Sequence, residues 1–566
     1  MATTNATSGL ESFGDAPSLA RLADRIQAGR PMIALAAILL TTGGHTMNLR
    51  ELGVSQGWVP AEVYTLQSGY LVSLALTMLA CPTLAQRLPC RVWAESGSVL
   101  AILGAFLNTL EWRVSLGMFL WGRIVAGAGA GLVIYFAPRL LDSRWRAAVG
   151  WAAILGPVAG PGVVAMATMF SETSDWRHGF VFEMTLAAAG LFALLSMKET
   201  PEARPRAPHG SLAYWPGLVI ASSAILYGLH YGQLQGWLES SDIQAALTVG
   251  GLALTVSIWM ARPQVSGKAL RENWVRLVLF FFGGMCQFFH GYVMNVYGGL
   301  IVNLSSWQRV WLIWPLPIGV GLALAASRIR WRRVRLVRGL SGAVGGLALL
   351  TVGFFLCHLE MMEWPYWDVR AVLDLNWFPA PGHWELAPGR FVMGLGIGLF
   401  MVAMDLESSP SPRREDMVRP FLQVAQFYGG GIAAAVLINF LIIGHKVHYS
   451  YSAERSAIQA EELELRAEAI GDHLRQAGQP APDRAAEVLL YRFINFEADN
   501  LVFATIYAAF AFATLGLTVF FLVLWIERLL RRAAHRRHPP PRREPSSRPK
   551  RRRRRRAGQR PAASRG

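Results

Sequence analysis

The chain has 566 residues, of which 53% are hydrophobic and 16% are charged, and its formal net charge is +17. Because soluble globular proteins carry roughly a quarter charged residues, this composition excludes an ordinary soluble protein and indicates a polytopic membrane protein. The excess charge belongs to the C-terminal tail, since residues 528–566 hold 17 Lys and Arg against one acid, Glu544.

Apolar runs of membrane-spanning length recur along the chain. Residues 1–30 form a polar lead, and we expect no cleavable signal peptide because the first apolar run already has spanning length. The pattern predicts about fourteen transmembrane helices. They are expected at residues 31–49, 63–82, 95–110, 116–138, 147–169, 179–197, 213–233, 243–261, 274–297, 308–326, 339–358, 389–406, 419–443 and 500–526.

Basic residues gather in alternate loops between these helices and set the predicted orientation. Arg87 and Arg91 lie in one such loop, and similar groups follow at residues 139–146, 198–206 and 328–338. The opposite loops are poor in Lys and Arg, except residues 444–498, where acids outnumber bases. Because basic loops stay in the cytoplasm, we predict a multi-pass protein of the inner (cytoplasmic) membrane with both termini cytoplasmic.

The predicted helix at 147–169 carries an unusual set of helix-bending residues. Pro157 and Pro161 each remove a backbone donor and bend the helix axis, whereas Gly156 and Gly160, one turn apart, allow close packing. Membrane helices tolerate such residues because neighbouring helices and water cavities satisfy the freed backbone groups. We interpret these four residues as the hinge and seal of a seam between moving parts.

An internal repeat indicates how the helices are grouped. Gly122-Arg123 with Gly127, Gly129 and Gly131 matches Gly389-Arg390 with Gly394, Gly396 and Gly398, position for position. Six helices, two inserted helices and six further helices explain this spacing. The predicted fold class is an all-α polytopic membrane protein. Its parts are a lead at 1–30, a six-helix bundle at 31–200, inserted helices at 201–265, a second bundle at 266–528 with outer loops 359–388 and 444–498, and a disordered Arg-rich tail at 529–566.

Five motifs in order, on the expected helices, resemble those of a known family. They are Arg123-x-x-x-Gly127-x-Gly129, Pro157-x-x-Gly160-Pro161, Trp176-Arg177, Gly228-Leu-x-x-Gly232-Gln233-x-x-Gly236-Trp237 and Gln426-x-x-Gly429-Gly430. Over nearly its full length the chain resembles the fourteen-span drug:proton antiporter branch of the major facilitator superfamily. The resemblance implies the major facilitator fold and alternating access. It also implies export of hydrophobic or cationic small molecules in exchange for protons, with the proton gradient as the energy source and no cofactor.

Three departures from the family pattern bear on this coupling. In the loop Pro82-Thr-Leu-Ala-Gln86-Arg87-Leu-Pro89-Cys90-Arg91, Gln86 replaces the Asp that latches the cytoplasmic face. Val164-Ala165 replace paired glycines, and Gly44 or His45 stands where the family has a proton-coupling Asp in helix one. The fold assignment survives these changes, but proton coupling by the usual route does not follow.

Ionisable groups inside the membrane are the candidates for transport and coupling, because such groups are costly there. Arg123 is either a sensor of substrate or of an acid's protonation state, or a structural, ion-paired arginine. His45 and Glu51 are candidate replacements for the missing Asp, unless they are a packed residue and a solvated helix end. Glu183 stands where the family has Asn, as a coupling carboxylate or a cation binder, unless Arg177 neutralises it.

Other polar residues in the predicted helices have simpler interpretations. His230 and His290 lie in apolar helices and are more typical of packing residues. Asp405 and Glu407 are expected to form a charge cluster with the neighbouring residues Arg413 and Arg414. Phe and Tyr residues of the helix at 274–297 either line a pocket for flat apolar cations or pack against lipid and neighbouring helices.

The remaining features concern partners and alternative functions. No nucleophile motif, phosphate loop or metal-ligand spacing occurs, and the four cysteines show no paired spacing, so we expect neither an enzyme nor a metal site. Residues 452–477 predict a surface helix, either a dock for a periplasmic adaptor protein or an ordinary solvated loop helix. The tail is expected to bind anionic lipid headgroups of the bilayer and no specific nucleic acid. Two alternatives stay open: a differently coupled or uncoupled exporter or facilitator of a specific metabolite, and a non-transporting membrane sensor or scaffold.

Overall fold

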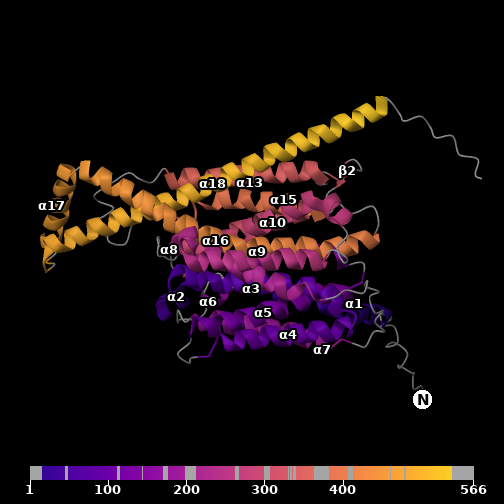
Figure 1. The fold of residues 1–566 in the computed structure, drawn as a ribbon. Helices are drawn as coiled ribbons and strands as arrows, with labels where there is room; N and C mark the ends of the chain where they lie inside the picture. The colour runs from indigo at the N-terminus through magenta and orange to yellow at the C-terminus, as the bar shows by residue number, and fades with distance from the viewer. Residues whose placement is uncertain are drawn as a thin grey trace, which may run out of the picture. The chain divides into compact units, whose positions relative to one another are not determined.

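The computed structural model is helical almost throughout (Figure 1). It describes residues 16–537, with gaps at 45–48, 111–114, 143–144, 170–175, 198–211, 262–266, 299–305, 329, 332–333, 336–338, 363–381, 406–411, 459, 477 and 479. Residues 1–518 form one compact unit, and the chain from Val519 onward forms a second. The described part of the second unit is the end of the last helix, which is apolar at first and then basic.

The first bundle contains six long helices and one short one. They are α1 (Ala16–Gly44), α2 (Leu49–Gln56), α3 (Pro60–Leu84), α4 (Cys90–Leu107), α5 (Leu116–Phe136), α6 (Arg146–Met169) and α7 (Arg177–Leu195), with a 3-10 turn, η2 (Ala137–Leu140), after α5. Helix α5 packs along α3 and α4, and α1 packs along α6 and α7 (Figure 1). Helix α1 begins well before the predicted residue 31, because the polar lead continues the same helix.

The second bundle follows an inserted helical pair. The pair is α8 (Trp215–Gln235) and α9 (Ser241–Ala261), joined by the 3-10 turn η4 (Trp237–Glu239). The bundle consists of α10 (Gly267–Val296), α11 (Ser306–Ile313), α12 (Pro315–Ala326), α13 (Gly339–Met362), α15 (Ala387–Asp405), α16 (Pro412–Ile458) and α18 (Pro482–Arg537). Two two-residue strands, β1 (Arg330–Trp331) and β2 (Val334–Arg335), pair between α12 and α13. The predicted helix at 308–326 is interrupted at Trp314, directly before Pro315.

The alternating glycines show that the two bundles are built alike. A Cβ on Gly127 of α5 would lie 2.2 Å from a backbone oxygen of α3, and a Cβ on Gly394 of α15 would lie 2.2 Å from a backbone oxygen of α12. Two residues later in each helix, a Cβ on Gly129 would lie 2.5 Å from a backbone atom of α4, and a Cβ on Gly396 would lie 2.5 Å from a backbone atom of α13. In each bundle the fourth helix therefore touches the second and the third through matched glycines, as the sequence repeat requires.

Twelve helices of the described chain are long and apolar enough to cross a membrane. Helices α1 and α8 lie outside this set and complete the fourteen that the sequence predicts, so the predicted fold class is confirmed. Helices α16 and α18 extend beyond the predicted spans at 419–443 and 500–526. Between them lies α17 (Ala460–Gln476), which agrees with the surface helix expected at 452–477. Gly478 follows it with a φ of +71°.

Candidate functional site

Arg123 and Glu183 form a buried ion pair in the first bundle. Arg123 Nη1 donates to Glu183 Oε2 at 3.0 Å, with 0% of the arginine side chain and 4% of the glutamate side chain exposed. The guanidinium carbon also lies 4.8 Å from the ring centre of Tyr70 and 5.3 Å from that of Phe180. Helices α3, α5 and α7 thus enclose one charge pair with an aromatic wall, where ring faces favour the cation.

Arg390, the repeat counterpart of Arg123, has a different partner. Its Nη2 donates to His290 Nε2 at 2.5 Å and to the Ile313 backbone oxygen at 3.3 Å. Both side chains are buried, and within the described chain Arg390 makes no ion pair. The two matched arginines therefore have different partners. Arg123 pairs with an acid, whereas Arg390 pairs with no carboxylate in the described ranges.

Helix α6 is attached to the second bundle through its backbone. Pro157 has no N–H, so the Ala153 oxygen lacks its usual partner four residues later in the helix. Gln426 Nε2 of α16 donates to this oxygen at 2.8 Å, and Gln287 Nε2 of α10 donates to the Ile154 oxygen at 2.9 Å. Gln426 also donates to Gln287 Oε1 at 2.8 Å, which links the two amides.

Contacts between the bundles also occur toward both ends of α6. Near its start, a Cβ on Gly150 would lie 2.6 Å from Asp405 Oδ2, and Asp405 pairs with Arg419 at 3.3 Å beside a small pocket. Near its end, Val164 and Ala165 pack against Val310 and Ile313, with Trp314 alongside. At one described end α6 thus lies against an ion pair of the second bundle, and at the other end it packs on apolar side chains.

Asp405 has an ion-pair partner that the sequence analysis did not name. It is Arg419, two turns into α16, whereas the expected cluster with Arg413 and Arg414 stays a prediction. Glu407 lies outside the described residues, as do the side chains of Arg413 and Arg414. The helical course of α16 brings Arg419 next to the end of α15, which sequence proximity does not show.

His230 joins the inserted helices to both bundles. Ser68 Oγ of α3 lies 2.8 Å from His230 Nε2 of α8 and donates to the Gly431 oxygen of α16 at 2.7 Å. Because the serine has a single proton, the histidine must donate from Nε2. His230 is fully buried, and this hydrogen bond agrees with the expectation of a packing residue whose polar group has a partner.

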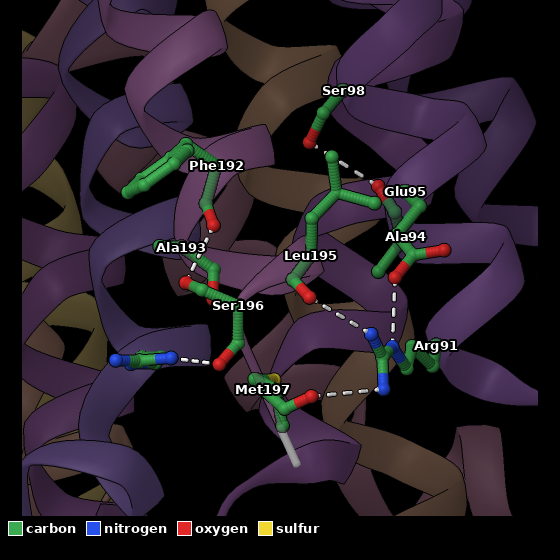
Figure 2. A network of polar contacts seen from close by, with 10 residues as sticks. Arg91, Ala94, Glu95, Ser98, Phe192, Ala193, Leu195, Ser196 and Met197 are labelled. Atoms are coloured by element: carbon green, nitrogen blue, oxygen red, sulfur yellow. Dashed lines mark hydrogen bonds and ion pairs between the residues drawn. The ribbon is translucent and has the colours of Figure 1, made fainter. Parts of the chain in front are cut away.

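Arg91, the last residue of the motif that departs from the family pattern, lies in the first turn of α4 and caps the end of α7 (Figure 2). Its Nη1 and Nη2 donate to the Met197 and Leu195 oxygens at 3.2 Å, and its Nε donates to Glu95 at 2.7 Å. Arg30 of α1 donates to the Ser196 oxygen in the same place. Helix ends leave carbonyls without partners and carry partial negative charge, so two arginines stabilise this terminus.

The structure describes some of the remaining candidate residues but not all of them. Gly156 and Gly160 face α1 of the same bundle, and a Cβ on Gly160 would lie 2.1 Å from the Leu40 oxygen. Pro157 and Pro161 lie within α6, and their hinge role stays a prediction. His45 lies outside the described residues, and Glu51 belongs to α2 without a described side chain.

Several contact residues carried no signal in the sequence analysis. Gln287 and Ser68 are ordinary polar residues in apolar helices, and nothing in their spacing marks their partners. One signal was available: Pro157 requires that some other donor satisfy the Ala153 oxygen.

Comparison with known proteins bears on the fold. No protein-family model matches the sequence, and no curated protein matches it either. One similar structure is a POT family transporter in complex with a thioalcohol-conjugated peptide (TM-score 0.51, 15% identity, 73% of this chain and 90% of that chain). Another is a POT family transporter in complex with 5-aminolevulinic acid (0.52, 14%, 85% and 96%). A third is a bacterial homologue of the human drug peptide transporters PepT1 and PepT2 (0.52, 14%, 90% and 99%).

These likenesses establish the architecture. All three structures are transporters with the major facilitator fold, and each is similar to this chain over more than two thirds of its length. At such low identity the comparison carries the fold alone, so the drug:proton antiporter branch stays a prediction. The chain is a multi-pass membrane protein with the major facilitator fold.

Proposed function

We propose that this protein is a secondary active transporter that exports hydrophobic or cationic small molecules across the inner membrane in exchange for protons. The buried Arg123–Glu183 pair is the observation that carries the proposal. A charge pair inside an apolar bundle is costly and typically marks a substrate or proton pathway. A proton on Glu183 removes the charge that neutralises Arg123, and so favours a conformation in which water reaches the arginine.

The seam along α6 supports alternating access. Its contacts with the second bundle include two amide hydrogen bonds to backbone oxygens, one small apolar cluster and the close approach of Gly150 to Asp405, which belongs to a partly exposed ion pair of the second bundle. Such contacts are individually weak and can break and re-form as two bundles rock. The predicted cytoplasmic termini place the Asp405 end of the seam toward the cytoplasm.

The test is uptake of the dye cation ethidium by inside-out membrane vesicles, with and without an imposed proton gradient. The unaltered protein should take up ethidium faster with the gradient, and Glu183→Gln should abolish this stimulation. If the unaltered protein takes up ethidium at the same rate with and without the gradient, proton exchange is refuted. Glu51→Gln tests the other candidate carboxylate in the same assay.

A matched variant separates coupling from stability. Glu183→Gln leaves Arg123 without its acid, so a loss of uptake can reflect misfolding. The double variant Arg123→Gln/Glu183→Gln removes both charges and retains side chains that can hydrogen-bond. If it is present in the membrane at normal levels and lacks gradient-driven uptake, the pair has a role in coupling.

A second candidate is an exporter of a specific metabolite without proton coupling. It is favoured by the ion pair itself, because an acid already neutralised by Arg123 can serve as a structural group. This candidate predicts no gradient effect on any dye and unchanged transport in the double variant.

A further inference from the structure

A second buried polar cluster surrounds Arg390, and the proton-exchange proposal does not use it. Arg390 Nε and Nη1, His290 Nδ1 and the Tyr507 hydroxyl are all buried and have no hydrogen-bond partner among the described residues. These residues come from α15, α10 and α18, and Arg390 interacts electrostatically with both of the others. Buried polar groups without partners are rare, so four such atoms in one cluster require an explanation.

The cluster consists of donors without an acceptor. Arg390 donates to His290 Nε2, so a neutral His290 carries its proton on Nδ1. The free groups are therefore N–H groups of Arg390, the Nδ1–H of His290 and the O–H of Tyr507. An anion supplies the acceptors and the negative charge that this arrangement lacks.

The first bundle shows what is missing. There the sixth helix of the bundle, α7, presents Glu183 to the matched arginine at 3.0 Å. In the second bundle the sixth helix, α18, supplies the buried hydroxyl of Tyr507, which interacts electrostatically with Arg390. The repeat thus preserves the cation, and no carboxylate of the described ranges pairs with it.

Aromatic rings adjoin the cluster. Phe289 stacks on Phe510 with ring centres 3.9 Å apart, and Phe354 lies 6.2 Å from the ring of Tyr507 and 5.4 Å from that of Phe510. The surroundings of the donors are therefore aromatic, which suits an acid whose body is apolar better than a polar acid.

We propose that Arg390, His290 and Tyr507 form a subsite for the carboxylate of a hydrophobic organic acid, which extends the substrate class beyond neutral and cationic molecules. The inference rests on the proposed transport function for access. Ile313, whose oxygen accepts from Arg390, packs on Val164 and Ala165 of the first bundle, so separation of the bundles uncovers this side of the cluster. The carboxylate accepts from Arg390 and from Tyr507, and replaces the acid that the second bundle lacks.

The experiment measures binding without transport. Purified full-length protein in detergent is titrated with benzoate, and with its neutral isostere benzamide, while the melting temperature is recorded. Benzoate should raise the melting temperature and benzamide should not. Equal effects of the two compounds, or an equal effect of chloride at the same concentration, would overturn the proposal.

Variants assign the binding to the cluster. Arg390→Gln and Tyr507→Phe should each weaken benzoate binding at least about tenfold, the loss expected for one charge-assisted hydrogen bond. Tyr507→Phe keeps the ring, so the test survives if Arg390→Gln fails to fold. Tyr214→Phe is the matched control for Tyr507→Phe: it removes a tyrosine hydroxyl that donates to the Leu79 oxygen, outside the cluster, and should bind benzoate normally. Normal benzoate affinity in Tyr507→Phe and Arg390→Gln refutes the subsite.

The outcomes separate this inference from the transport proposal. Benzoate binding that depends on Arg390, in a protein whose ethidium uptake ignores the proton gradient, retains the subsite and refutes proton exchange. Gradient-driven ethidium uptake without selective benzoate binding retains proton exchange and refutes the subsite.

Discussion

Gln426 of α16 donates to the Ala153 oxygen of α6, the oxygen that Pro157 deprives of its helical partner. Pro157 thus removes a hydrogen bond within the first bundle, and Gln426 of the second bundle replaces it across the seam. The missing hydrogen bond at Pro157 and the contact between the bundles are therefore one feature. Any motion that separates α6 from α16 exposes this oxygen and must offer it water.

Replacing Gln426 should therefore have an effect that depends on residue 157. Gln426→Leu leaves the Ala153 oxygen without a donor and should lower the free energy of unfolding by about 1–2 kcal/mol. In a Pro157→Ala background the restored N–H at position 157 satisfies that oxygen, so the same change should cost less. A double-mutant cycle by SDS unfolding measures the coupling. Additive effects of the two changes would contradict the proposed link.

The Arg123–Glu183 pair should show strong coupling in stability. Either single change, Arg123→Gln or Glu183→Gln, leaves one buried charge unpaired and should destabilise the protein by about 3–5 kcal/mol. The double change should recover most of this loss. Thermal unfolding in detergent is the measurement, and a double variant as unstable as the sum of the singles would show that the two side chains act independently.

Ser68 should be more sensitive than a similar serine within the same helix. Ser68→Ala removes the bond to Gly431 and leaves His230 Nε2–H without an acceptor. Ser73→Ala, the matched control, removes only one serine bond, to the Ile124 oxygen at 2.7 Å. We expect a cost of about 1–3 kcal/mol for Ser68→Ala and less for the control, because a stranded buried donor adds to the loss. Similar unfolding midpoints for the two variants would argue against the His230 contact.

Glycine substitutions should separate close helix contacts from open surface. Gly160→Ala would place a Cβ 2.1 Å from the Leu40 oxygen and should destabilise the first bundle by more than about 1–3 kcal/mol, since backbone atoms have to move. Gly251 of α9 has no atom within 4 Å of its Cβ position, so Gly251→Ala should be neutral or stabilise by up to about 1 kcal/mol. Melting temperatures of the two variants in detergent check this, and a tolerated Gly160→Ala would contradict the packing of α6 on α1.

The chain length, the apolar runs and the repeat predicted the fold class, because crossing a lipid bilayer restricts a chain to helices of a recognisable length and composition. The alternating glycines were informative for the same reason. They recur only where a helix meets two neighbours closely, and both copies do so in the structure. Helix bounds were predicted less well outside the membrane, where α16 and α18 continue through polar sequence without a breaking residue.

By itself the sequence determined that Arg123, Glu183 and the prolines of α6 are costly in a membrane, and that Arg390 repeats Arg123. Only the tertiary structure decided which partner compensates the burial of each residue. Glu183 is paired by Arg123, sixty residues away in sequence, and the nearby Arg177 is not its described ion-pair partner. Arg390 meets His290, and the oxygen freed by Pro157 meets Gln426. The physical reason is that burial cost depends on residue type and depth, which sequence shows, whereas hydrogen bonds and ion pairs depend on distances of about 3 Å that only the packing of helices defines.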